Sequence, residues 1–368
     1  ITGKYYNLTI PQTSIEGKDF TGKIYVTNHS CSTSEIPPAY ITLLKAYGGK
    51  DNITELPDSA FANATTANDK GMYKKNDDLG TSYYYRGAVD NNWVKFGKEG
   101  TKDIYWRIIR INGDGSIRMI YSGTTAPTES TKVVMTGTGT QITVDNTNTF
   151  KFNSSHNNPS YVGYMFTEGQ QHGNGTPSTI KTAIDNWYKT TTLETDATTK
   201  ELVSQDQIFC NDRSATTSDS GTPGEISGSM STSTTYYYGA YARLVKNKKP
   251  KLTCTTASDK FTVNTSNGNG ALTYPVGLIT ADEVAMAGGK FGTGNSTYYL
   301  YTNQYYWSGS PVNFGGGNAF AFEFSVYSSG LLSSYDVSYT IGTRPVVSLS
   351  SKAKLSGNGT YSKPYTVS

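Results

Sequence analysis

The strongest constraint on the fold is a pair of strand-like runs that flank a glycine-containing turn. Residues 105–111 and 116–121 are rich in β-branched and aromatic side chains, and the sequence between them is NGDG. Asn-Gly and Asp-Gly steps favour the backbone of a tight hairpin turn, so this segment predicts a β-hairpin. We expect its three arginines to point outward; they are Arg107, Arg110 and Arg118.

Other strand-type segments lie on both sides of this hairpin. They cover residues 81–87, 92–96, 305–308, 319–326 and 344–349. Pro345 places the last of these at a sheet edge or marks its start. Residues 1–35 predict two or three further strands, whereas residues 36–82 have no sustained period apart from an apolar stretch at 39–44.

Two helices are predicted. Residues 178–189 carry apolar side chains at helical spacing, and Ser178 supplies an N-cap. A second, shorter helix follows Thr280, which has the spacing of a capping box with Glu283, and the glycines at 288–289 end it.

The composition indicates a secreted β-rich protein and not a disordered chain. Hydrophobic residues make up 35% of the chain and charged residues 17%, and there are 29 tyrosines. Surfaces solvated by hydroxyl and amide groups are common on secreted β proteins, and an aromatic content of 12% supplies the core that disordered chains lack. Residues 122–160 and 214–235 are rich in small polar residues and predict long loops.

Charge and targeting signals limit the partners. The net charge of +3 is spread along the chain, and its one basic run, residues 246–251, is short and contains a proline. We interpret this run as a solvated turn, so no nucleic acid partner is expected.

The sequence begins at Ile1 and contains no signal peptide, lipidation motif or long apolar run. We expect a mature or trimmed product that is extracellular, on the cell surface or secreted, with no direct membrane insertion.

The three cysteines are Cys31, Cys210 and Cys254. They show no CxxC spacing, which argues against a zinc site. We expect a disulfide between Cys210 and Cys254 that closes the polar insertion between them, with Cys31 free or paired to another chain. The alternative is three reduced thiols in a cytosolic protein.

Four segments between residues 83 and 349 occur in an order that resembles a known fold. They are residues 105–111 with their hairpin partner, residues 178–188, residues 277–284, and residues 306–311 followed by Gly330 and residues 342–346. This order resembles the C-type-lectin-like fold, in the branch related to formylglycine-generating enzymes. More closely, it is similar to bacterial and phage-associated domains of unknown function built on that fold.

The resemblance implies an α+β C-type-lectin-like domain at residues 66–368, with twisted antiparallel sheets, two short helices and long loops. Residues 1–65 are then an N-terminal β segment or the end of a preceding β domain. Similar C-terminal segments are the variable regions of proteins diversified by diversity-generating retroelements. In those proteins a constant scaffold holds the ligand-contacting positions.

We predict no catalytic residues, metal ligands or cofactors. The histidines lie in polar loops without a recognisable triad or HExxH context; they are His29, His156 and His172. Asp212 and Arg213 are either a functional pair or, more simply, a structural ion pair beside the disulfide. Formylglycine-generating enzymes need a reactive cysteine pair near the C-terminal end, and no cysteine follows Cys254. The tripeptides typical of calcium-dependent lectins are absent as well.

Binding chemistry is concentrated near the C-terminus. Eight tyrosines lie between residues 298 and 339, interleaved with Ser, Gly and Asn, which is the composition of an antibody paratope. The alternative is that these tyrosines only decorate a β surface. The predicted ligand contacts are Tyr305, Ser308, Val312, Asn313, Phe314, Asn318, Phe320, Phe322, Tyr327, Leu331, Ser333, Tyr335 and Tyr339.

The predicted hairpin and helix should build a rigid frame. We expect the tryptophans to be buried in this frame, with Trp307 only partly buried. We expect Arg344 to form ion pairs or hydrogen bonds within the frame and not to contact a ligand. The sequence thus predicts a noncatalytic adhesin or receptor-binding protein whose partner is a host or bacterial surface protein or a glycan. An alternative is a structural subunit of an extracellular filament, pilus or surface layer that self-assembles through residues 1–35. A divergent enzyme of unnamed type is a further alternative.

Overall fold

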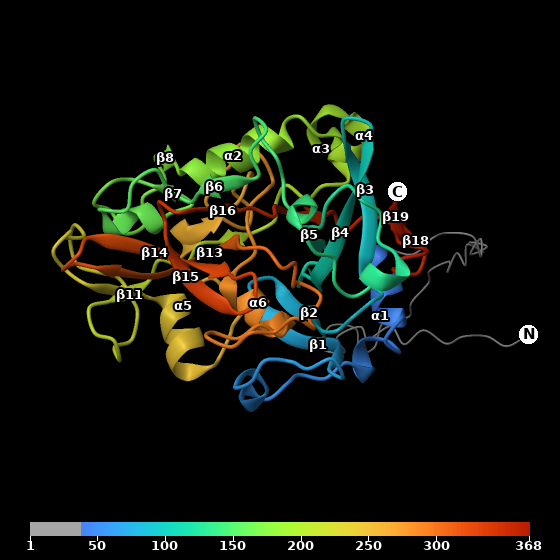
Figure 1. Cartoon of the computed structure of the whole chain (residues 1–368), viewed down its shortest axis with the longest axis horizontal. Helices are drawn as coiled ribbons and strands as arrows, with labels where there is room; N and C mark the ends of the chain where they lie inside the picture. Colours follow the sequence, from blue (N-terminus) through green and yellow to red (C-terminus); the bar gives the residue numbers. More distant parts are fainter. Residues whose placement is uncertain (1–37) are drawn as a thin grey trace, which may run out of the picture. The chain divides into compact units, whose positions relative to one another are not determined.

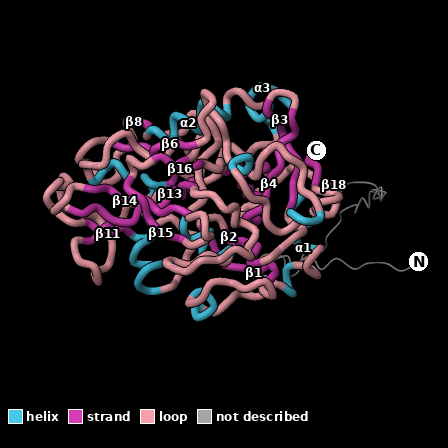
Figure 2. The backbone as a smooth tube through the Cα atoms, in the orientation of Figure 1, coloured by secondary structure: helices cyan, strands magenta, loops and turns pink. Residues whose placement is uncertain are grey.

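The computed structural model describes residues 38–368, and the chain divides into a segment Ile1–Glu35 and a compact unit Ile36–Ser368. Figures 1 and 2 show the helices and strands of that unit. Cys31, His29 and the predicted self-assembly through residues 1–35 lie outside the described residues. Within residues 38–368, no helix is long and apolar enough to cross a membrane.

The predicted hairpin is confirmed and lies in a sheet for which eight strands are described in residues 38–368. Strands β4 (Lys102–Ile111) and β5 (Ile117–Tyr121) pair antiparallel, and the Gly115 N–H donates to the Asn112 carbonyl oxygen at 2.9 Å. The sheet order is β1-β2-β4-β3-β19-β18, and β5 pairs with β4 and β17. The other strands are β1 (Lys70–Asp77), β2 (Gly80–Gly87), β3 (Trp93–Glu99), β17 (Val346–Leu349), β18 (Leu355–Ser356) and β19 (Tyr365–Val367).

A second sheet contains most of the C-terminal region. Its main path is β10-β11-β13-β14-β15, and β16 pairs with both β13 and β6. Figure 1 shows β13, β14 and β15 next to one another. The strands are β6 (Thr149–Lys151), β10 (Ala215–Thr216), β11 (Tyr236–Tyr238), β13 (Tyr306–Gly315), β14 (Phe320–Val326), β15 (Leu332–Asp336) and β16 (Thr340–Gly342). Two small pairs join β7 (Met165–Phe166) to β8 (Thr176–Pro177) and β9 (Phe209–Cys210) to β12 (Lys260–Phe261).

Both predicted helices are confirmed. Helix α2 (Thr179–Tyr188) begins after Ser178, whose hydroxyl accepts the Lys181 N–H at 3.3 Å. Helix α6 (Ala281–Ala287) begins with the predicted capping box and ends at Gly288, which has φ +122°. The other helices are α1 (Ala39–Lys45), α3 (Thr192–Thr195), α4 (Ala197–Glu201) and α5 (Gly239–Tyr241). A π-helical turn covers Ala242–Asn247, and 3₁₀ turns cover Lys50–Asn52, Asp58–Phe61, Glu129–Thr131, Thr138–Thr140, Pro159–Val162 and Ala257–Asp259.

Aromatic rings join the hairpin to α2. The rings of Trp106, Tyr121 and Trp187 pack edge to face, with centroids between 5.5 and 6.3 Å apart. Such pairs contribute about 0.5–1.5 kcal/mol each beyond the area that they bury. Trp93 is fully buried as well, so the predicted burial of Trp93, Trp106 and Trp187 is confirmed. Trp307, which we expected to be partly buried, is fully buried.

Some elements were not apparent in the sequence pattern. β1 lies in residues 36–82, where its KGMYKKND sequence offers little alternation, and β18 and β19 follow the strand that we expected to be last. The unit also extends N-terminal of residue 66, because Ala39 and Leu43 of α1 are fully buried in its core. The architecture is mostly β-sheet with a few short helices, in agreement with the α+β class.

The predicted Cys210–Cys254 disulfide is present. It links residues 44 positions apart in the sequence, and Cys210 pairs with Lys260 in the small β9–β12 sheet. The Cys254 N–H donates to Asp78 Oδ2 at 2.8 Å. The bond therefore fixes the two ends of the polar insertion that contains residues 214–235.

We predict that replacing both cysteines by serine lowers the free energy of unfolding by about 2–4 kcal/mol, because the open chain gains conformational entropy when it unfolds. The measurement is urea unfolding followed by tryptophan fluorescence, with the Cys31→Ser variant as the background and control. Equal stability of the two proteins would contradict a structural role for the bond.

Candidate functional site

The three hairpin arginines are buried, so the prediction that they point outward is wrong. Arg107, Arg110 and Arg118 are 1%, 6% and 1% exposed. The sequence pattern suggested a solvated face, but buried residues occupy both alternating faces of β4 and β5. Arg107 is held by hydrogen bonds to neutral groups, since its Nε donates to Asn92 Oδ1 and its Nη2 to the Val89 carbonyl, both at 2.7 Å. Burial lowers the pKa of Arg107 to about 9.

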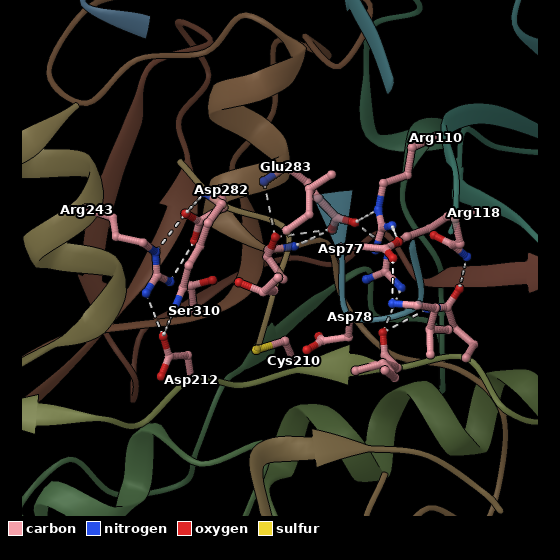
Figure 3. Close-up of a pocket in the computed structure, with 18 residues that line it drawn as sticks. Asp77, Asp78, Arg110, Arg118, Cys210, Asp212, Arg243, Asp282, Glu283 and Ser310 are labelled. Atoms are coloured by element: carbon pink, nitrogen blue, oxygen red, sulfur yellow. Dashed lines mark hydrogen bonds and ion pairs between the residues drawn. The ribbon is translucent and has the colours of Figure 1, made fainter. Parts of the chain in front are cut away.

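Arg110 and Arg118 share the buried carboxylate of Glu283 (Figure 3). Glu283 Oε1 lies 2.9 Å from Arg110 Nε and 2.6 Å from Arg118 Nε, while Oε2 accepts the Thr280 N–H at 2.9 Å. Arg110 Nη1 also lies 2.6 Å from Asp77 Oδ2. Burial favours the neutral acid, but the two arginines outweigh it and hold the pKa of Glu283 below its ordinary value. We call Glu283, Arg110, Arg118 and Asp77 the Glu283 cluster.

A second group of buried ion pairs lies near the disulfide. Arg243 Nη1 is 2.6 Å from Asp212 Oδ2, and Arg243 Nη2 is 2.8 Å from Asp282 Oδ2. Arg213 pairs instead with Asp259, at 2.6 Å. Asp212 and Arg213 are therefore not paired with each other, and each forms a structural ion pair with a different partner.

The pocket in Figure 3 lies between these two groups, with Cys210, Asp78 and Ser310 between the Arg243 side and the Arg110 side. Its cavity volume is about 30 Å³. One water needs roughly 10–15 Å³, so the cavity has room for about two or three water molecules. Asn112 Oδ1 lines it and has no hydrogen-bond partner among the described residues. The pocket is thus a polar interior of the frame and too small for a substrate.

Three predicted ligand contacts belong to the frame, and their assignment to the binding surface is wrong. Ser308, Val312 and Phe314 in β13 are 0%, 3% and 0% exposed. The Ser308 hydroxyl donates to the Phe324 carbonyl oxygen at 2.9 Å. β13 is paired on both edges, with β11 and β14, and its side chains are covered, so a ligand cannot reach these positions.

Four predicted contacts come together as a tyrosine cluster, which consists of Tyr305, Tyr327, Tyr335 and Tyr339. The Tyr327 and Tyr335 rings stack with centroids 4.9 Å apart and planes 16° apart, and Tyr339 stacks on Tyr335 at 5.2 Å. Tyr305 lies 4.9 Å from Tyr327 and 5.8 Å from Tyr335. Tyr339 is 58% exposed and Tyr305 is 36% exposed. Partial burial and the neighbouring hydroxyls raise the pKa of Tyr335 to about 12, so its hydroxyl is neutral at physiological pH.

Other tyrosines from the same stretch build the frame. Those that are buried are Tyr298, Tyr299 and Tyr306. Arg344 lies over the Tyr306 ring, 5.0 Å from its centroid, and donates to the carbonyl oxygens of Tyr121 and Leu300 at 2.9 and 3.0 Å. The predicted scaffold role of Arg344 is confirmed, and it acts through hydrogen bonds.

The remaining predicted contacts do not all share the surface of the tyrosine cluster. Phe320 and Phe322 are half-buried, and the His156 ring packs 4.3 Å from Phe320. His156 Nδ1 lies 3.1 Å from Asp336, which pairs with Phe322 between β14 and β15. Because side chains alternate along a strand, Phe322 and Asp336 lie on the opposite side of the sheet from Tyr335. Partly or fully exposed positions complete the set: Asn313, Asn318, Leu331 and Ser333.

His172, which is not part of the Glu283 cluster or the tyrosine cluster, is paired with acidic side chains. Among residues 38–368, no group of three or more His, Cys, Asp or Glu side chains is placed to hold a metal ion. His172 lies 2.9 Å from Asp259 and 3.0 Å from Glu225. Burial opposes the charged form of His172, but the two acids outweigh burial and raise the pKa of its imidazole.

Glu323 in β14 is a buried acid without a hydrogen-bond partner. Its side chain is fully buried, and within the described residues neither carboxyl oxygen has a hydrogen-bond partner. Burial raises the pKa of Glu323 well above its ordinary value, against the opposing charge of Arg213. The carboxyl group therefore resists ionisation in the folded protein.

We predict that Glu283→Gln lowers the free energy of unfolding at pH 7 by about 3–5 kcal/mol, because two buried arginines lose their shared charge. The folded-state pKa of Glu283 is depressed, so its stabilisation is present above about pH 4.3, the ordinary Glu value, and is lost as the pH falls. Urea unfolding at pH 7 and pH 3 measures both effects. The exposed Glu201→Gln is the control and should leave stability unchanged. A Glu283 variant equal to wild type at pH 7 would rule out this role.

Glu323→Gln should have the opposite effect. The folded-state pKa of Glu323 is raised, so the wild type loses stability as the pH rises above about 4.3, where the unfolded chain ionises first. The amide cannot ionise, and we expect this variant to be more stable than wild type at pH 7 by about 1 kcal/mol or more, with the difference vanishing near pH 4. The same unfolding measurement applies, with the exposed Glu201→Gln as control. A destabilised variant at pH 7 would mean that the carboxylate is ionised and stabilised in the native state.

The segments that carry the resemblance to the C-type-lectin-like fold occupy the hairpin, α2, α6 with the chain before it, and β13 with the chain around Gly330 and β16. Comparison of the chain with protein-family models, curated proteins and solved structures finds no match. The C-type-lectin-like relationship stays a prediction that rests on the four segments.

Proposed function

We propose that this protein is a noncatalytic, surface-exposed ligand-binding protein of the adhesin or receptor-binding type, and that the tyrosine cluster is its principal contact. The observation that carries this proposal is the stack of the partly exposed Tyr327 and Tyr335 with the exposed Tyr339, with Tyr305 against its side. Tyrosine supplies a large amphipathic contact area with few rotatable bonds. Rings that already hold one another lose little further entropy when a partner binds.

The partner that suits this surface is a host or bacterial surface protein or a glycan. The cluster is uncharged and combines ring faces with hydroxyl edges, so it complements a patch that is partly apolar and partly hydrogen-bonding. Leu331 precedes β15 and Ser333 lies in it, two positions before Tyr335, and both are partly exposed. The Cys210–Cys254 bond supports an oxidising, extracytoplasmic location, and we propose that the protein works at the cell surface or after secretion.

We further propose that the scaffold is C-type-lectin-like and that its C-terminal segment is of the diversified kind. This part of the proposal rests on the four segments in order, together with a tyrosine cluster that is separate from the buried ion pairs. A reverse transcriptase gene and a near-copy of the coding segment for residues 305–349 beside this gene are the expected genomic context. Sequencing of the locus tests it, and a locus without either element contradicts it.

We predict that Tyr335→Ala and Tyr339→Ala each raise the dissociation constant for the partner at least tenfold, since central aromatic side chains dominate such interfaces. The partner is first selected on arrays of purified extracellular proteins and glycans, and affinities are then measured by surface plasmon resonance. Tyr339 is mostly exposed, so its replacement leaves the fold intact.

The matched control is Tyr361→Ala, which removes a partly exposed tyrosine whose side chain hydrogen-bonds with Glu129 and not with the cluster. We expect it to bind as tightly as the wild type. If both cluster variants bind like the wild type, the binding surface lies elsewhere and the proposal is overturned.

A further inference from the structure

A second concave surface lies along α2, apart from the tyrosine cluster. Helix α2 forms one wall, the chain from Val144 to Ser154 forms another, and the β7–β8 pair completes it. Figures 1 and 2 show α2, β6 and β8 close together. The groove has a volume of about 560 Å³, and small-molecule sites typically enclose roughly 300–1,000 Å³. It is therefore large enough for a ligand, unlike the cavity in Figure 3.

The lining of this groove combines aromatic rings with neutral polar groups. Phe150 and Phe166 contribute rings that are half-buried. Around them lie five hydroxyl side chains, two amide side chains and the carboxylate of Asp145. Among the described residues that line the groove, none is Lys, Arg or His. The groove thus offers apolar faces and many hydrogen-bonding groups, without a cation.

The backbone at the rim of the groove holds Asp145 in place. Val144 and Thr147 exchange backbone hydrogen bonds at 2.8 and 2.9 Å, which closes a two-residue turn. Asp145 and Asn146 have φ +51° and +61°, the left-handed conformation that such a turn requires of both residues. Asp and Asn adopt this conformation more readily than other non-glycine residues, which explains the turn. The turn therefore places Asp145 in the lining of the groove, where its carboxylate can accept hydrogen bonds.

We propose that this groove binds a neutral oligosaccharide. A sugar ring has a C–H face that packs on an aromatic ring and an equator of hydroxyl groups, which the amides, hydroxyls and carboxylate of the groove can satisfy. A phosphorylated or otherwise anionic ligand needs Arg or Lys partners, which the lining lacks. A purely apolar ligand would leave the polar groups of the lining unpaired, at a cost in free energy.

The groove also continues past Asp145, which favours a chain of sugars over a single one. A neighbouring hollow of about 360 Å³ shares Val144, Asp145 and Asn186 with it and adds Trp187 and Lys189 to the lining. Lys189 Nζ donates to the neutral Asn186 Oδ1 at 2.7 Å, so its charge lies in this hollow and outside the lining that contains the two phenylalanines. The site shares no lining residue with the tyrosine cluster and goes beyond the function proposed above.

The experiment uses an array of neutral hexose and N-acetylhexosamine oligosaccharides, with sialylated and phosphorylated forms of the same chains. We expect the full chain to bind neutral members and not their anionic forms. Thr182→Trp places a large side chain in the groove from an exposed position on α2, and Phe166→Ala removes a ring. Each variant should weaken binding at least tenfold, as measured by isothermal titration calorimetry.

The controls separate the groove from other surfaces. Thr198→Trp makes the same substitution at an exposed position on α4, outside the groove, and should bind like the wild type. Tyr339→Ala should also bind these sugars normally, whether or not the tyrosine cluster has a ligand. Thermal unfolding confirms that each variant is folded.

Four results would overturn the inference. They are the absence of binding to any neutral oligosaccharide at millimolar concentration, binding of anionic forms alone, binding that survives both Thr182→Trp and Phe166→Ala, and binding that Tyr339→Ala abolishes. The last result would assign the sugar to the tyrosine cluster and would thereby support the proposed function instead.

Discussion

The carboxylate of Glu283 joins parts of the chain that are far apart in the sequence. One oxygen caps α6, and the other lies against two arginines of the central hairpin, whose charges Glu283 and Asp77 balance together. Each of these charges is buried, and a buried charge that loses its partner destabilises the fold by several kcal/mol. Each charged side chain therefore stabilises the folded state only while its partners are present. Asp77 extends the cluster to β1. Helix α6 extends it to the second sheet, because the Ala281 N–H donates to Ser310 Oγ in β13 at 2.9 Å. The strands that carry the tyrosine cluster therefore depend on an ion cluster in the interior.

Local sequence patterns predicted the elements but not the way in which they cover one another. The hairpin, α2, α6 and the disulfide follow from signals within a few residues, such as turn glycines, helical spacing and a capping box. The arginines were placed wrongly because a polar residue in an alternating strand normally faces solvent. Here the positions on both faces of β4 are buried. The acid that balances the buried arginines is Glu283, which the sequence identified only as the capping-box residue of a helix. Its contact with the arginines forms in the tertiary fold and could not be read from the local sequence.

The binding surface was predicted from composition, and composition does not say which side chain faces out. Tyr305 and Tyr306 are neighbours, yet Tyr306 is fully buried and Tyr305 is exposed. Successive side chains of a strand point to opposite faces, so alternation would have predicted that only one of these two tyrosines faces solvent. The same rule would have removed some of the buried β13 positions from the predicted ligand contacts. His156 gave no such signal, because it lies in a polar loop and meets Ser338 only across 182 residues of sequence. The groove along α2 is likewise assembled from three segments that are unremarkable one by one.

The tyrosine cluster and the Glu283 cluster share no side chain, and this bears on how such a surface can change. The cluster tyrosines make their ring contacts with one another, and none of them joins the Glu283 cluster. Replacing an exposed side chain usually alters stability by no more than about 0.5 kcal/mol, whereas breaking a buried ion pair costs several times more. Substitution at Tyr339, which is 58% exposed, should therefore have little effect on folding, as the proposed binding role requires. A frame stabilised in its interior by ion pairs, a disulfide and tryptophans packed edge to face can present a different side chain at Tyr339 without being rebuilt.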